Sequence, residues 1–386
     1  MKKLLLLSVI GLTLSGCGGS DDNSAPTPMA NPSSVIGTVD SVNVKNNTVT
    51  VNGYSYQIAD VTYGSTTLPT TYLQPKMMVQ IGSNISRSAA VNVQLEPTMI
   101  GTIGNIDRLA KTFSLNGATL TFSGLSPEIE TGDRVMVSSL PTANAGYKVL
   151  SVVKFDIEFG EPDEIEGRIS NIDANTRTFT LGANINVQYD ERITSLQIGQ
   201  WVEVEGAMQG ADFVASKVEV ENYDHFDGDN ELEGIVTWVA KDQSEFTLNY
   251  RGSFVVDNAT RFEDGLKTHL KQGVEVEVRS RMNAGKRIAT IVEFDDMDSD
   301  QDNEWDGKEF ECEGVVSNLD QDAKTFTMPR CENGFDQVIN NTVTIDAQTR
   351  FDGILEQDIV NGSRIEVEGF IIDGQNIASE IEPEFN

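Results

Sequence analysis

Hydrophobic and polar residues alternate through most of the chain, in short runs separated by Gly, Asn and Asp. The run from Gly199 to Gly206 shows the pattern. Val202 and Val204 point to one side of an extended chain, and Glu203 and Glu205 point to the other. Such alternation is typical of β-strands with one buried face, and helical periodicity is nearly absent. The chain is therefore predicted to be all-β.

One unit of this kind recurs along the chain. A glycine inside an apolar run is followed 12 positions later by a hydrophobic residue of the next run. The glycines are Gly37, Gly101, Gly167, Gly234 and Gly314. Each copy is predicted to hold five short strands in about 65 residues, which suits a small OB-like barrel. The fold class is therefore a tandem array of about five small five-stranded OB-like barrels, behind a signal peptide and a flexible tether.

Domain boundaries follow from this repeat and from the composition of the segments around it. The last run of the third copy is predicted to place Val214, Ser216, Val218 and Val220 on one face. The predicted boundaries are residues 1–16 for a lipoprotein signal peptide, 17–33 for the lipidated cysteine and tether, 34–97, 98–158, 161–223 and 231–295 for four barrels, 296–308 for an acidic linker, and 309–386 for the fifth barrel.

The third to fifth copies share short motifs. A Glu-Gly pair is followed by Thr-Phe-Thr in Glu166–Thr180 and in Glu313–Thr327, and a Thr-Arg-Phe element lies in Asp257–Gly265 and Asp346–Gly353. The copies close on G..VEVEG and A..VE. These motifs resemble bacterial repeats known as domain of unknown function 5666, although the first two copies lack the Thr-Arg-Phe element. The resemblance implies exported or lipid-anchored small β-barrels, and it implies no reaction.

The first residues resemble a lipoprotein signal. Lys2 and Lys3 precede the apolar run Leu4–Leu14, and Cys17 follows Leu-Ser-Gly, which resembles a lipobox. Cys17 is then the lipidated residue that anchors the chain to a membrane, and Gly18 after it favours the outer membrane of a Gram-negative bacterium. The alternative is an ordinary cleaved signal peptide. The predicted location is the cell envelope, with an unknown envelope protein or glycan as partner.

Charge narrows the function further. Asp and Glu number 60 against 28 Lys and Arg, and the formal net charge is −32. Such a surface repels nucleic acid and attracts cations, so no nucleic-acid partner is expected. His225 and His269 lie in no catalytic motif and are read as surface residues. Carboxylate pairs such as Glu203 and Glu205 are read as a solvated strand face. No enzyme is predicted and no catalytic residue is assigned.

The cysteine count fits an exported protein. With Cys17 lipidated, Cys312 and Cys331 form an even pair, for which a disulfide is the expectation and two free thiols the alternative. Cys312 lies in the first strand of the fifth copy and Cys331 just beyond its second. The disulfide would be a local staple of one hairpin.

The acidic stretch before the fifth copy has the oxygen-ligand spacing of a calcium loop. Positions 1, 3, 5, 7, 9 and 12 fall on Asp298, Asp300, Asp302, Glu304, Asp306 and Glu309. Asn303 replaces the usual Gly at position 6, and both flanks read as strands. Two interpretations stay open: a Ca²⁺ site that stiffens the joint between two barrels, and a solvated spacer.

Two tryptophans are predicted on the outward faces of their barrels. Trp201 and Trp238 either contact a ligand or partner, or pack against the adjacent unit. The sequence favours a non-enzymatic, membrane-anchored binding or scaffold module. The alternative is a carbohydrate-active or hydrolytic protein with a site between barrels. Carboxylates gathered beside Trp201 or Trp238 would favour that alternative.

Overall fold

The computed structural model describes residues 31–82, 90–142, 144–155, 162–182, 184–193, 195–226, 228–295, 309–333, 337–347, 349–372 and 374–384. Within them the elements are β-strands and three short 3₁₀ helices: η1 (Thr70–Tyr72), η2 (Lys267–His269) and η3 (Glu356–Asp358). No helix in this part of the chain has the length and apolar character needed to cross a membrane. The all-β prediction is confirmed.

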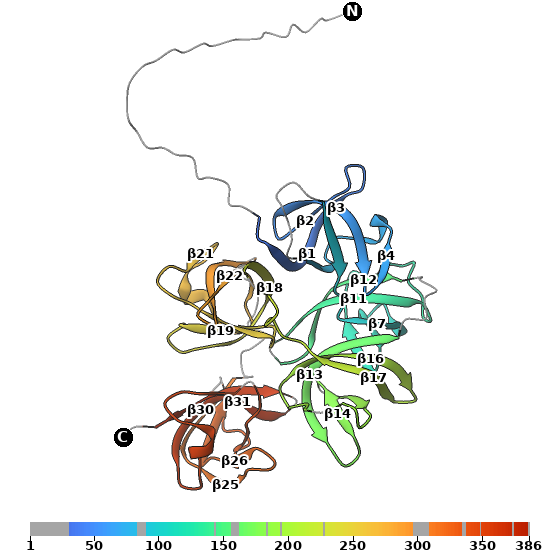
Figure 1. Cartoon of the computed structure of the whole chain (residues 1–386). Helices are drawn as coiled ribbons and strands as arrows, with labels where there is room; N and C mark the ends of the chain where they lie inside the picture. The colour runs from blue at the N-terminus through green and yellow to red at the C-terminus, as the bar shows by residue number, and fades with distance from the viewer. Residues whose placement is uncertain are drawn as a thin grey trace, which may run out of the picture. The chain divides into compact units, whose positions relative to one another are not determined.

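Figure 1 labels the strands in chain order, and we group them here by the predicted units 1 to 5. Unit 1 holds β1 (Ser34–Asn43), β2 (Thr48–Val51), β3 (Tyr54–Tyr63), β4 (Thr66–Leu68), β5 (Met78–Ile81) and β6 (Val91–Leu95). Unit 2 holds β7 (Met99–Thr102), β8 (Gly104–Asp107), β9 (Thr112–Leu115), β10 (Ala118–Thr121), β11 (Arg134–Pro141) and β12 (Tyr147–Lys154). Unit 3 holds β13 (Asp163–Asp173), β14 (Thr178–Leu181), β15 (Ile185–Gln188), β16 (Trp201–Gln209) and β17 (Asp212–Val220).

The last two units, like unit 1, carry short additional strands. Unit 4 holds β18 (Asp229–Val239), β19 (Glu245–Leu248), β20 (Gly252–Val255), β21 (Arg261–Glu263), β22 (Glu275–Asn283) and β23 (Lys286–Phe294). Unit 5 holds β24 (Glu309–Val315), β25 (Ser317–Asp320), β26 (Thr325–Thr327), β27 (Arg330–Asn333), β28 (Thr342–Thr344), β29 (Arg350–Phe351), β30 (Arg364–Ile372) and β31 (Gln375–Pro383).

Unit 3 is a closed five-stranded barrel. β13 pairs with β14, β14 with β15, β15 in parallel with β17, β17 with β16, and β16 with β13. Units 1 and 4 close through the equivalent pairings. In unit 2, none of the described pairings joins β10 to β12. The OB-like type and the count of five repeats stay predictions.

The alternation of β16 is as predicted, but that of β17 is not. Val202 and Val204 are fully buried in the barrel of unit 3. In β17 the buried residues are Phe213 and Ala215, whereas Val214 is only partly buried and Ser216 is exposed. A β-bulge between Glu205 and Gly206 of β16 shifts the register of this pair. The extra residue moves the first half of β17 to the opposite face, which a strict period of two cannot anticipate.

The repeated glycines have a steric cause in three units. A Cβ added to Gly234 would lie 2.2 Å from the side chain of Asn249, 15 residues later. Asn249 has φ 54° and sits in the turn between β19 and β20. Its amide donates to the carbonyl of Glu233, and its oxygen accepts from the N–H of Ile235. Gly37 and Gly101 lie equally close to the side chains of Asn52 and Asn116. The glycine therefore leaves room for a turn asparagine, which in units 2 and 4 hydrogen-bonds to the first strand.

Pro32–Asn386 form one compact unit. β1 and β18 pair in parallel, and β7 pairs with β13. Arg168 of unit 3 forms an ion pair with Asp346 of unit 5, and both side chains are buried. The outward faces of several barrels are therefore interior surfaces of the array, so polar residues on these faces meet other units as well as water.

Candidate functional site

Acidic residues cover the outward side of three neighbouring strands in unit 5. Alternation along β24, β30 and β31 points Cys312, Val367 and Ile381 inward, where each is at most 1% exposed. The glutamates between these residues form two cross-strand rows. One row is Glu311, Glu368 and Glu380, and the other is Glu313, Glu366 and Glu382. We call these six residues the unit 5 acidic face. Like charges directly opposite one another on a sheet are destabilising, so this face requires compensation.

One lysine from unit 4 supplies part of that compensation. The Nζ atom of Lys241, between β18 and β19, lies 2.9 Å from Glu366, 3.1 Å from Glu368 and 2.7 Å from Glu382. A single ammonium group thus serves three of the six carboxylates. The remaining three receive no ion pair from the described residues.

Glu380 is the unusual member of the remaining three. It is 8% exposed, and its carboxylate makes no hydrogen bond or ion pair within the described part of the chain. Burial and, after it, the negative charges of Glu368 and Glu382 together raise the pKa of Glu380 to about 7. The side chain is largely buried, but its carboxylate oxygens open on solvent, where a nearby positive charge would favour the ionised form. Glu380 therefore marks a place for a positive charge or a hydrogen-bond donor.

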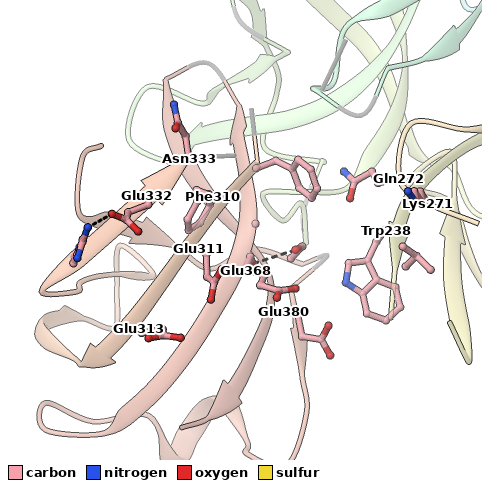
Figure 2. A pocket seen from close by; sticks show the side chains of 15 residues that line it. Trp238, Lys271, Gln272, Phe310, Glu311, Glu313, Glu332, Asn333, Glu368 and Glu380 are labelled. Carbon is pink, nitrogen blue, oxygen red and sulfur yellow. Dashed lines mark hydrogen bonds and ion pairs between the residues drawn. The ribbon is translucent and has the colours of Figure 1, made fainter. Parts of the chain in front are cut away.

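Glu380 lines a groove of about 610 Å³ between units 4 and 5. Figure 2 shows Trp238, Lys271 and Gln272 on the unit 4 side, facing the glutamates of unit 5. Five glutamates line the groove, against two cationic side chains. These are Glu311, Glu313, Glu332, Glu368 and Glu380, with Lys271 and Arg330. Arg330 is already paired with Glu332, so the groove keeps an excess of negative charge.

Oxygen ligands of two clusters lie close enough to hold a metal ion. Carboxylate oxygens of Glu311, Glu313 and Glu366 lie within 4.8 Å of one another. A second cluster of the same kind joins Glu233 and Glu275 of unit 4 to Asp295. Hard divalent cations such as Ca²⁺ prefer ligand sets composed of oxygen atoms. Both clusters also have competing roles, because Glu366 contacts Lys241 and Glu275 pairs with Lys148.

Both predicted tryptophans are at junctions between units. Trp201 is 1% exposed, stacks on Tyr250 of unit 4 with ring centroids 5.9 Å apart, and donates from Nε1 to Glu166 at 3.0 Å. Trp238 is 8% exposed, and the guanidinium of Arg350 lies 4.9 Å from its ring centre. Trp201 thus takes the packing role left open in the sequence. Trp238 also packs against the next unit, but it lines the groove as well.

Cys312 and Cys331 form a disulfide across directly opposite positions of β24 and β27. Their Cα atoms are 4.2 Å apart. Phe310 and Glu311 precede Cys312, and Arg330 and Glu332 flank Cys331, and all four line the groove. The disulfide therefore ties together two strands of one groove wall.

Other predicted site residues lie outside the described residues. They are Cys17 and, in the acidic linker, Asp298, Asp300, Asp302, Glu304 and Asp306. Glu309 is described only as the first residue of β24. The strands on both sides of the linker, β23 and β24, are as expected. The calcium loop itself stays a prediction.

The solvated-face interpretation of Glu203 is wrong. This side chain is half-buried. Its burial and, to a smaller extent, the negative charge of Glu166 raise its pKa to about 7. The reason is that the outward face of the unit 3 barrel packs against other units. Sequence reasoning missed the glutamate rows for the same reason. The sequence did contain a signal for these rows. When the first, fourth and fifth strands of a unit are paired as neighbours, their glutamates fall directly opposite one another.

The fold and site define an all-β array of small barrels with acidic faces at its internal junctions. Residues 166–219, 233–293 and 313–382 match the model of a domain of unknown function, DUF5666. The chain therefore contains tandem repeats of the DUF5666 family. A search of curated proteins found no match to this chain.

Proposed function

We propose that this protein is a non-enzymatic, lipid-anchored lipoprotein of the cell envelope that binds a basic segment of another envelope protein in the groove between units 4 and 5. The single observation that carries the proposal is Glu380, a largely buried side chain whose carboxylate has no partner among the described residues, at a groove lined by five glutamates. A lysine or arginine side chain supplies both the charge and the N–H donors that this carboxylate lacks.

The groove also offers apolar contact to such a segment. Trp238, Phe310 and Phe370 line it beside the glutamates. The methylene stems of lysine and arginine pack well against aromatic surface while their charged ends reach carboxylates. A glycan would use the aromatic surface but not the negative charge, so a basic peptide suits the lining better.

The anchor and the tether complete the proposal. Lipidation of Cys17 would hold the array at a membrane, and the polar segment up to residue 33 would let the array reach its partner. Calcium is a second cation that would stabilise this joint, either in the predicted loop from Asp298 to Glu309 or at Glu311, Glu313 and Glu366. The binding test therefore includes a calcium arm.

A hydrolytic role is the second candidate, because carboxylates do gather beside Trp201. Glu166 accepts a hydrogen bond from this tryptophan, and Glu203 lies opposite Glu166 on the sheet. However, Glu166 already forms an ion pair with Arg251. Incubation with chromogenic glycosides tests this candidate. Turnover that is lost in Glu203→Gln would support it over the binding role.

The binding test uses a fluorescent octalysine peptide and the full chain at low salt. The double variant Glu311→Gln/Glu380→Gln should bind about tenfold or more weakly, because it removes two negative charges from the groove. The matched control is Glu128→Gln, an exposed glutamate of unit 2. Calcium should compete with the peptide where they share ligands. Equal affinity of the double variant and the control would overturn the proposal.

A further inference from the structure

A second cavity, of about 220 Å³, lies where units 1, 2, 3 and 4 meet. Unit 1 contributes Glu96 and unit 2 contributes Ser139, while Glu203 comes from unit 3 and Arg251 from unit 4. The cavity is distinct from the groove, with which it shares no lining residue.

Four glutamates contribute to the lining of this cavity. Glu96, Glu166, Glu203 and Glu221 line it, and Arg251 is the only lysine or arginine among its described lining residues. Arg251 pairs with Glu166, which also accepts from Trp201. The other three carboxylates make no hydrogen bond or ion pair within the described residues. The cavity thus holds three carboxylates without partners.

Two shielded oxygen atoms at this cavity lack a partner. Ser139 is 6% exposed, and its hydroxyl makes no hydrogen bond to a described residue. The Oε1 atom of Glu96 is likewise shielded from solvent and unpaired. Burial and, to a smaller extent, the negative charge of the nearby Glu166 raise the pKa of Glu96 to about 8. Buried polar atoms of native proteins are almost always satisfied, so these atoms point to a ligand in the cavity.

Part of the cavity lining is apolar. Ile36, Met78, Leu140 and Phe226 line it, each at most 8% exposed, and they belong to one hydrophobic cluster. A hydrated metal ion gains nothing from such a wall. Moreover, no three carboxylates of this cavity bring their oxygens within 4.8 Å of one another, as direct coordination of an ion would require.

We infer that this cavity binds a primary alkylammonium group, with the ammonium at Glu96, Glu203 and Ser139 and the methylene chain against Ile36, Met78 and Leu140. The volume equals about seven water molecules at ~30 Å³ each, which suits a chain of four or five carbons with one or two amines. A free diamine and a lysine side chain from another protein share this chemistry.

The experiment is calorimetric titration of the full chain with 1,4-diaminobutane at pH 8 and constant ionic strength. Saturable binding is expected, whereas 1-butanol, which has the same carbon chain without charge, should not bind. Nα-acetyl-lysine amide forms the second arm. If it binds and the diamine does not, the lysine side chain is the source of the ligand.

The matched variants are Glu203→Gln, Ser139→Leu and Glu380→Gln. Glu203→Gln should weaken diamine binding about tenfold, and because it removes repulsion among carboxylates, it should fold. Ser139→Leu should block the cavity by volume. Diamine binding that persists in Glu380→Gln, a variant of the groove, belongs to this cavity and not to the groove, so this inference and the proposed function can fail separately. Absence of saturable binding for both amines, or equal binding of 1-butanol, would overturn the inference.

Discussion

The acidic faces of units 3 and 5 are built from equivalent strands but are compensated differently. In unit 3, Glu166 lies opposite Glu203, and Glu203 opposite Glu219. Arg251 from unit 4 pairs with Glu166 of this face, beside a cavity of about 220 Å³. In unit 5, Lys241 from unit 4 contacts only part of the face, and a larger groove covers the rest.

The difference shows that a motif glutamate has no fixed role in this array. Its role depends on which residue the neighbouring unit places against it. At unit 3 the neighbour provides an arginine between two barrels, and at unit 5 it provides a lysine that is 42% exposed. The first arrangement stabilises a junction around a small cavity, and the second leaves carboxylates along a larger groove.

The largest effect is expected for Arg251, at the junction of units 3 and 4. Arg251→Met removes the cation from Glu166 and leaves four glutamates around the cavity, so the free energy of unfolding should fall by about 3 to 5 kcal/mol. Urea denaturation followed by tryptophan fluorescence measures this loss, because Trp201 lies at the junction. Adding Glu166→Gln to the variant should recover part of the loss. No recovery would contradict the ion-pair explanation.

The disulfide is a staple that unit 5 has and unit 3 lacks. Cys312 and Cys331 are 19 residues apart, and closing a loop of this length contributes about 3 kcal/mol. The double variant Cys312→Ala/Cys331→Ala should lower the thermal midpoint of unit 5 and weaken octalysine binding. The unit 3 junction should keep its protection from hydrogen exchange. A uniform loss of protection across all units would contradict this local role.

Much of the local structure could be predicted from the sequence, because it depends on residues close together in the chain. The strand character of the Gly199–Gly206 run and the outward position of Trp201 are examples. The burial of Glu203 could not be predicted, because it depends on contacts with units far away in sequence. The β17 register was mispredicted because one extra residue at a bulge leaves no mark on composition. The contacts of Trp201 with Tyr250 and of Trp238 with Arg350 depend on how the units meet, which the sequence of a single repeat does not determine.

The pH dependence should follow the crowded glutamates. Burial and, after it, the negative charges of Glu231 and Glu233 together raise the pKa of Glu277 in unit 4 from 4.5 to about 9. A raised carboxyl pKa favours folding at low pH, and this contribution is lost as pH rises towards 9. The thermal midpoint should therefore fall between pH 5 and 9. Glu277→Gln should flatten this fall, and a midpoint that rises over the same range would contradict the assignment.

The smallest effect is expected for Lys241, the half-exposed cation at the unit 5 acidic face. Lys241→Met should cost about 1 kcal/mol or less, because exposed ion pairs contribute little to stability. It should also strengthen octalysine binding, since the freed carboxylates add to the negative charge of the groove. Parallel denaturation and fluorescence titrations measure both effects. A loss of stability as large as that of Arg251→Met would remove the distinction between the two faces.

The most direct test of the groove is the titration of Glu380 itself, followed by carbon NMR of ¹³C-labelled glutamate side chains with and without octalysine. Assignment uses Glu380→Gln, which deletes one signal. We predict that Glu380 titrates near pH 7 in the free protein and at clearly lower pH when the peptide is bound, because a cation favours the ionised carboxylate. Titration near 4.5 that is unaffected by peptide would contradict the account.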